Sequence, residues 1–381
     1  MEGPRGTKTL EIQKVIDLIN QVFRIDAGLA PTMGQEFPLL LTEKNKERMR
    51  IMLEDDQPVA VVNYYKSNFL IQGTPISVGS VGAVCTHPEY QGQGLATILL
   101  DDVEEQMRQE GILIMLVSGR LNVYRRRACS VAGDFYKVSL LPSKEEKEVT
   151  LIPYELQHMD LMRQLYHLES LRYERTYEEF DGLLEGSITP WGNYQYEVYM
   201  IQQQEEICGY FVLRLIQEGE KTYGYIREYA GDRSMILEGA LAALDRHHLS
   251  HIDIYFPSQD PIKFPMMRKG IEIQRENQLG TMKILQFTKL MDQLQSYFSR
   301  YVPEDLLNQL EYYEKDRIYG LAIGEEKIEF ATLNEVNQFI FGIDHENASY
   351  SWDMEDKPFL RKFCTAVFPV PVPWAGGLNF I

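Results

Sequence analysis

Apolar side chains in the first part of the chain recur first at helical spacing and then in strand-like runs. Positions 12, 15, 16, 19, 22 and 23 carry Ile, Val or Phe at intervals of three and four residues, which predicts an amphipathic helix over residues 10–24. Residues 49–53, 59–65 and 76–85 are rich in Val, Ile and Tyr, and turn-forming residues separate them. These three runs predict strands joined by hairpins.

The third predicted strand leads into a glycine-rich segment, THPEYQGQG, at residues 86–94. Leu95, Ile98, Leu99, Val103 and Met107 then share a helical spacing, and a short apolar run follows at residues 112–117. The pattern therefore predicts the order strand, glycine-rich loop, helix, strand.

A second region repeats this layout with weak sequence similarity. Its pattern predicts a helix over residues 161–168, strands at 198–201, 208–215 and 223–229, a helix over 235–244 and a strand at 252–256. This repetition is typical of a duplicated domain. Residues 230–234 read AGDRS, with one glycine and an acidic side chain, where the first copy has QGQGLA. We therefore expect the second copy to have lost the chemistry of the first.

The pattern changes again from about residue 288. A helix is predicted over residues 290–301, strands at 318–323 and 327–330, and a further helix over 332–341. The chain ends in FPVPVPWAGGLNFI, whose three prolines and two glycines exclude a regular helix or a central strand. We expect an extended tail that is ordered only where another part of the protein docks it.

Composition narrows the class of protein. With 381 residues, 44% of them hydrophobic and 25% charged, the chain is long enough for two or three folded cores. Lys and Arg number 38 against 56 Asp and Glu, a net charge of -18 that disfavours nucleic acid and anionic membranes and favours a cationic or amine-bearing substrate.

The cysteines and histidines suggest no metal site. Four dispersed cysteines form no pair with zinc-site spacing and fit a reducing compartment. The sequence HHLSH at residues 247–251 places adjacent histidines on different faces of a helix, so we expect no metal there. No apolar window is long enough for a membrane span, and a cytoplasmic location is expected.

The glycine-rich turn is the strongest chemical signal. Gly92 and Gly94 allow the backbone to turn sharply and approach a ligand, so that N–H groups at the helix start can face a pyrophosphate. No GK[ST] follows, and the spacing is not that of a dinucleotide fold. Judged by this segment alone, an ordinary strand-to-helix turn remains open.

The longer segment VGAVCTHPEYQGQGLATILLDDVEEQM resembles the acetyl-CoA signature of the GCN5-related N-acetyltransferases (GNAT), Q/R-x-x-G-x-G/A. Gln91, Gly94 and Ala96 stand in its three defined positions. The resemblance implies an acetyl-CoA site in two parts. The backbone of Val84, Cys85 and Thr86 would pair with the pantetheine arm, and the pyrophosphate would be held by Gln91, Gly92, Gln93, Gly94, Leu95 and Ala96.

The whole chain resembles the Eis-like acetyltransferases of the enhanced intracellular survival type. That resemblance implies an α/β (α+β) protein with two tandem GNAT-type mixed-sheet domains and a smaller sterol-carrier-like α+β domain. The catalytic domain would span residues 1–146, the degenerate copy 147–287, and the sterol-carrier-like domain with its extended tail 288–381. A homo-oligomer, a trimer or hexamer, is also implied.

The resemblance further implies three catalytic candidates. Tyr124 stands where the family carries the tyrosine that protonates the leaving thiolate, although a core tyrosine is the alternative. The carboxylate of Ile381 would enter the first domain as a base, unless the tail merely packs there. Glu36 is the other carboxylate candidate, with an exposed loop acid as its alternative.

The expected function is transfer of an acetyl group from acetyl-CoA to a primary amine by direct attack in a ternary complex. The acceptor would be a small molecule of polyamine-like or aminoglycoside-like character, or a Lys-bearing one. One alternative is a non-catalytic protein that binds acyl-CoA or lipid. A second is an assembly role for the degenerate copy.

Overall fold

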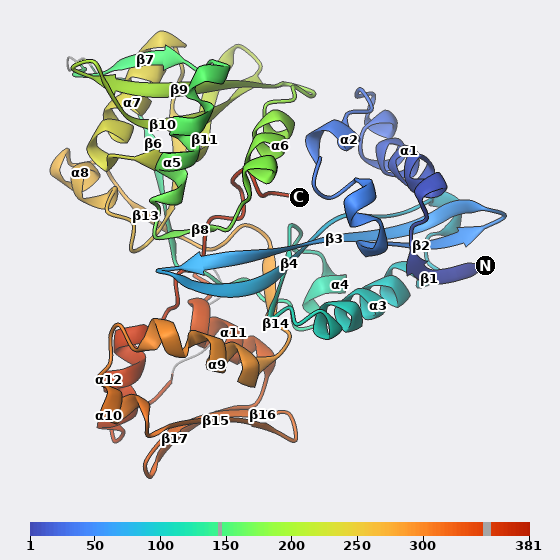
Figure 1. Cartoon of the computed structure of the whole chain (residues 1–381), viewed down its shortest axis with the longest axis vertical. Coiled ribbons are helices and arrows are strands. Elements are labelled where there is room, and N and C mark those ends of the chain that lie inside the picture. Colours follow the sequence, from blue (N-terminus) through green and yellow to red (C-terminus); the bar gives the residue numbers. More distant parts are fainter. Residues whose placement is uncertain (144–146, 346–351) are drawn as a thin grey trace.

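The computed structural model describes residues 1–143, 147–345 and 352–381. Its first sheet carries the glycine-rich loop (Figure 1). The strand order is β1 (Glu2–Gly6), β2 (Met49–Glu54), β3 (Gln57–Ile71), β4 (Thr74–Thr86), β5 (Ile114–Val117) and β14 (Thr281–Ile284), and β8 (Leu171–Tyr173) pairs with the end of β3. The β4–β5 pair is parallel, and the other pairs of this sheet are antiparallel.

Two helices cover the first sheet on opposite faces. The apolar stripe of α1 (Ile12–Phe23) packs on β2 and β3 through Val15 and Ile19. On the other face Leu99 and Val103 of α3 (Leu95–Gln109) contact the same strands. The helices and strands that the sequence predicts for this region are therefore present.

The second sheet repeats the arrangement. Its order is β13 (Gln274–Glu276), β6 (Phe135–Leu140), β12 (Ile252–Pro257), β11 (Lys221–Gly231), β10 (Glu206–Glu218), β9 (Tyr194–Gln203) and β7 (Thr150–Pro153). Helix α7 (Arg233–Arg246) packs on one face with α8 (Lys263–Arg268), and α5 (Met159–His167) and α6 (Tyr177–Ser187) pack on the other. The order β11, α7, β12 matches β4, α3, β5, which confirms two tandem GNAT-type sheets.

The two sheets exchange strands, so the domain boundaries expected from the sequence need correction. Strand β6 lies within residues 1–146 but joins the second sheet, and β14 lies within 147–287 but joins the first. A short apolar strand carries no local signal for the sheet edge it pairs with, so sequence order misplaces both. The position of the first expected boundary, residue 146, lies outside the described residues.

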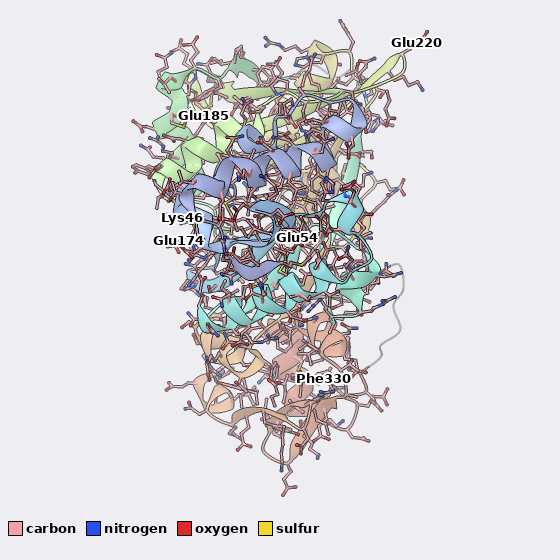
Figure 2. All side chains as sticks on the ribbon, turned by 90° about the vertical axis from the view of Figure 1, so that its right-hand side faces the viewer. Lys46, Glu54, Glu174, Glu185, Glu220 and Phe330 are labelled. Atoms are coloured by element: carbon pink, nitrogen blue, oxygen red, sulfur yellow. The ribbon has the colours of Figure 1, made fainter. Side chains whose placement is uncertain are left out.

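The last part of the chain forms a third sheet with helices on it. Its strands are β15 (Leu310–Lys315), β16 (Ile318–Ile323) and β17 (Glu326–Phe330), all antiparallel. The helices are α9 (Phe287–Phe298), α10 (Glu304–Leu307), α11 (Leu333–Phe341) and α12 (Pro358–Val367). Their hydrophobic core also includes Phe69, near the end of β3, and Ile76, near the start of β4. Figure 2 shows Glu220 of the second part and Phe330 of the third toward opposite ends of the molecule.

The tail beyond α12 has no helix or strand and returns to the first two sheets. Val370 and Val372 are buried in the third core. Farther along, Arg227 donates a hydrogen bond of 2.8 Å to the carbonyl of Gly377, and Arg175 donates one of 2.8 Å to the side chain of Asn379. The predicted extended, docked tail is present, and the chain ends beside α6 (Figure 1).

Candidate active site

Strands β4 and β5 separate just before the glycine-rich loop. They pair only from Val78 to Val81, and beyond Val81 no described residue of β5 pairs with β4. Strand β4 also has a bulge at this point, where its pairing with β3 shifts by one residue. Ala83 in the bulge has φ of 48°, and its carbonyl accepts a hydrogen bond from the side-chain amide of Asn63. Residues 84–86 consequently present a free strand edge that an extended ligand can pair with.

The loop after β4 leaves a row of free backbone N–H groups at the start of α3. Gly92 and Gly94 have φ of 76° and 79°, and a Cβ on either would meet no atom within 4 Å. The backbone N–H groups of residues 92–96 donate to no acceptor in the described part of the chain. The Gln91 amide closes the loop on the carbonyl of Thr86 at 3.3 Å. Successive free N–H groups at a helix N-terminus are suited to a phosphate group.

A cavity of about 340 Å³ opens where the two strands separate. It is lined by the first sheet, the second sheet and the tail, and it brings Tyr124, Glu36 and Ile381 together. Tyr124 lies in α4 (Asn122–Arg125), is 5% exposed, and its hydroxyl has no hydrogen-bond partner among the described residues. Burial, with a smaller contribution from Cys129, raises the pKa of Tyr124, so its hydroxyl is protonated at neutral pH.

The last residue lies directly against β4. A Cβ built on Gly82 would come within 2.6 Å of the carboxyl carbon of Ile381, so only glycine leaves room for the chain end here. The contact joins the tail to the strand that separates from β5.

Residues 4–132 match the family model described as an acetyltransferase (GNAT) domain. This segment is a GNAT domain. That family takes its acyl group from coenzyme A. The match covers the glycine-rich loop, β4, β5 and Tyr124 together.

The whole chain shares its fold with several solved structures. A GCN5-related N-acetyltransferase from Anabaena variabilis is 12% identical with a TM-score of 0.67, covering 96% of this chain and 97% of that chain. Eis1 from Mycobacterium abscessus is 11% identical with a TM-score of 0.58 and 98% coverage of both chains. A conserved protein of unknown function from Enterococcus faecalis is 13% identical with a TM-score of 0.60 and 96% coverage of both. No curated protein sequence matches the chain.

Glu36 borders the cavity but is neither an exposed loop acid nor a free carboxylate. It ends α2 (Met33–Glu36), where Arg24 forms an ion pair of 2.6 Å with it and the hydroxyl of Thr32 donates to it at 2.6 Å. The side chains of Arg24 and Glu36 are 8% and 6% exposed. The Arg24 guanidinium also lies 4.2 Å from the ring centroid of Trp191. These contacts hold the wall of the GNAT domain cavity in place.

Cys85 has a buried side chain on the α1 face of the sheet. Burial raises the pKa of its thiol to about 12, which excludes a thiolate nucleophile at neutral pH. Only its backbone faces the free strand edge. Arg127, near Tyr124, is engaged by Asp101 and Glu104.

In the second copy, carboxylates of the chain occupy the corresponding helix start. Asp232 accepts hydrogen bonds from the N–H groups of Ser234 and Met235 at 2.8 Å and 3.0 Å. Glu169 accepts one from Gly231 at 3.1 Å and pairs with Arg233. Carboxylates therefore satisfy the N–H groups of Gly231, Ser234 and Met235 here, whereas those of residues 92–96 in the GNAT domain are free.

Sequence reasoning missed two lining residues, Arg214 on β10 and Arg227 on β11. Both belong to the second sheet, far along the chain from the glycine-rich loop. Arg214 stands in an apolar run of β10, and Arg227 follows Tyr225 and Ile226 in β11. An isolated arginine in such a strand does not indicate which cavity its side chain faces.

Two further findings concern metals and membranes. In the ranges that the structure describes, no group of three or more His, Cys, Asp or Glu side chains is placed to hold a metal ion. No helix within these ranges has both the length and the apolar character that crossing a membrane requires.

Proposed function

We propose that this protein transfers an acetyl group from acetyl-CoA to a primary amine of a small molecule by direct attack in a ternary complex. One observation carries the proposal. The free N–H groups at the start of α3 and the unpaired hydroxyl of Tyr124, a residue that lines the cavity, flank the same separated strands.

The coenzyme binds along the free edge of β4. Its pyrophosphate accepts hydrogen bonds from the N–H groups of residues 92–96, and the loop is held by Gln91. The pantetheine arm extends along Val84, Cys85 and Thr86 as an added strand. This placement directs the thioester toward Tyr124 and the cavity.

The reaction exchanges a C–S bond for a C–N bond. A neutral amine attacks the thioester carbonyl, and the C–S bond breaks to give the coenzyme thiolate. Tyr124 gives its phenolic proton to that thiolate, and the carboxylate of Ile381 accepts the proton lost by the amine. Proton exchange with solvent then returns Ile381 to its carboxylate and Tyr124 to its neutral phenol. Glu36 does not serve as the base, because Arg24 and Thr32 already engage both of its oxygens.

The test is thiol release from acetyl-CoA with a panel of small amines and Lys peptides, using wild type and Tyr124→Phe. We expect turnover with an amine and a kcat lower by about 100-fold or more in Tyr124→Phe, the range of general acid catalysis. The phenyl ring preserves packing, so the Kd for acetyl-CoA should be unchanged. Equal turnover by both proteins would contradict the acid role, and tight coenzyme binding without turnover on any amine would favour a non-catalytic acyl-CoA-binding protein.

We also propose that the protein is a homo-oligomer, a trimer or hexamer, as the Eis-like resemblance implies. Size-exclusion chromatography with light scattering measures this directly. A strict monomer at micromolar concentration would contradict it.

A further inference from the structure

Arg227 is a buried cation without an anionic partner. It is 7% exposed, and its guanidinium donates to the carbonyls of Ser187 at 3.2 Å and Gly377 at 2.8 Å. No described carboxylate lies within 4 Å of it, and its Nε has no hydrogen-bond partner among the described residues. Neutral carbonyls satisfy only part of its donors and none of its charge.

Arg214 lies beside Arg227 in the same cavity wall and is less satisfied. Its guanidinium is 4.9 Å from the ring centroid of Tyr194, 5.4 Å from that of Tyr196 and 5.7 Å from that of Tyr225. The ring of Tyr196 is also 5.9 Å from Arg227, which places both cations around one ring. Among the described residues Arg214 makes no ion pair, and its buried Nε has no partner.

The other charges of the cavity compensate this pair only in part. Arg24 and Glu36 neutralise each other in their ion pair. The terminal carboxyl of Ile381 lines the cavity but lies more than 4 Å from both arginines, since neither forms an ion pair with it. Burial and the neighbouring Arg214 lower the pKa of Arg227 to about 10, so it is still charged at neutral pH.

An unpaired buried charge is strongly unfavourable in a folded protein. The chain carries 56 acidic residues against 38 basic ones, yet no acidic side chain of the described residues pairs with these two cations, and the terminal carboxylate of Ile381 in the same cavity balances one positive charge and not two. Two converging guanidinium groups with unused donors are suited to a carboxylate or a phosphate.

We propose that the acceptor is a small amine that also carries an anionic group, a carboxylate or phosphate, bound by Arg214 and Arg227 while its amine faces Tyr124. The proposal rests on the proposed acetyl transfer and specifies its substrate class. It differs from the cationic acceptor expected from the net charge, because the local field of the cavity is set by its lining residues and not by the whole chain. The volume of about 340 Å³ suits a small molecule.

The test compares amines of one length that differ in the distal group: 5-aminopentanoate, pentylamine and cadaverine. We expect kcat/KM to be at least about 10-fold higher for 5-aminopentanoate, the range of a charge-assisted hydrogen bond. A second comparison sets O-phosphoethanolamine against ethanolamine and measures the gain in kcat/KM from a phosphate. The larger of the two gains shows whether the site prefers a carboxylate or a phosphate.

Arginine variants locate the effect. Arg214→Gln and Arg227→Gln should raise KM for the anionic amine by about 10-fold or more and leave KM for acetyl-CoA unchanged. Arg214→Lys keeps a charge and should restore part of the preference. Arg361→Gln, on the exposed face of α12, is the matched control. Melting temperatures identify any variant that does not fold, and Arg214→Gln, at the less buried position, is the primary test.

The outcomes separate this proposal from the enzymatic one. Equal or better turnover of pentylamine and cadaverine would overturn the anionic acceptor and leave acetyl transfer intact. If no amine is turned over, titration calorimetry measures whether 5-aminopentanoate and O-phosphoethanolamine bind to the wild type and to Arg214→Gln. Binding that Arg214→Gln abolishes would support the anion site without the transfer, and no binding of either to wild type would overturn it.

Discussion

At the scale of single residues, Tyr124 combines burial with an unengaged hydroxyl. A buried phenol normally finds a partner. Here Tyr124 lines the cavity that opens where β4 and β5 separate. This arrangement is what distinguishes Tyr124 from the many tyrosines that pack in the cores of the protein.

The raised pKa of Tyr124 predicts the pH dependence of the reaction. Because burial raises that pKa above its ordinary value, the phenol is protonated at every pH below it and is lost as an acid only when pH rises through it. We expect no decline of kcat between about pH 7 and pH 10. A decline near pH 8 that disappears in Tyr124→Phe would contradict this, since it would place the pKa of the acid well below the free phenol.

Gly82 predicts a steric test of the chain end. In Gly82→Ala the new Cβ would lie 2.6 Å from the carboxyl carbon of Ile381, so the tail must move out of the cavity. We expect amine turnover to fall by about 10-fold or more, because the proton acceptor is displaced, while coenzyme binding is retained.

Gly182→Ala is the control for that variant. Gly182 lies inside α6, and its Cβ would meet only Leu39 at 3.9 Å. The exchange should stabilise the protein by about 1 kcal/mol through helix propensity and leave kcat unchanged. Unaltered turnover in Gly82→Ala would show that the position of the chain end is irrelevant to the reaction.

At the scale of elements, the N-termini of α3 and α7 differ by what occupies them. Gly94 begins α3 without a side-chain cap, whereas Asp232 caps α7 with its own carboxylate. The helix dipole favours an anion in both cases. The first copy leaves that position to a ligand, and the second fills it.

A carboxylate added to the loop of α3 should therefore compete with the coenzyme. We expect Gln93→Asp to raise KM for acetyl-CoA by about 10-fold or more through repulsion of the pyrophosphate, and the effect should shrink at high salt. Gln93→Asn has a nearly identical shape without the charge and should change KM by less than about 2-fold. Equal effects of the two variants would mean that the loop does not contact the phosphates.

At the scale of the whole molecule, the tail connects all three parts. It leaves the third core at Val372, accepts a hydrogen bond from Arg227 at Gly377 and one from Arg175 at Asn379, and ends on Gly82 of β4. The cavity is complete only when residues from both sheets and the tail are in place.

Shortening the tail tests this dependence. A chain ending at Asn379 should lose amine turnover by about 100-fold while it binds acetyl-CoA normally, because the coenzyme loop lies away from the tail. Ile381→Ala keeps a terminal carboxyl group and should retain most of the activity. Loss of coenzyme binding in the shortened chain would show that the tail supports the fold and does not act in the reaction.

Much of the fold follows from local patterns. The stripe of α1, the strand runs of β2 to β4 and the prolines of the tail each reflect a periodicity or backbone restriction within a few residues. The loop of residues 91–96 is likewise local, because its glycines and the helix start are adjacent in sequence. These parts, and the match of the first domain to an acyltransferase family, were within reach of the sequence.

Only the tertiary structure decided which residues meet at the cavity. The strand exchange of β6 and β14, the ion pair that removes Glu36 as a base, and the two unpaired arginines all depend on contacts between distant segments. Side-chain spacing fixes which face of an element is apolar, but it does not fix which other element covers that face. The tertiary packing thus sets the charge of the acceptor site, and the arginines there are positive although the chain as a whole has a negative net charge.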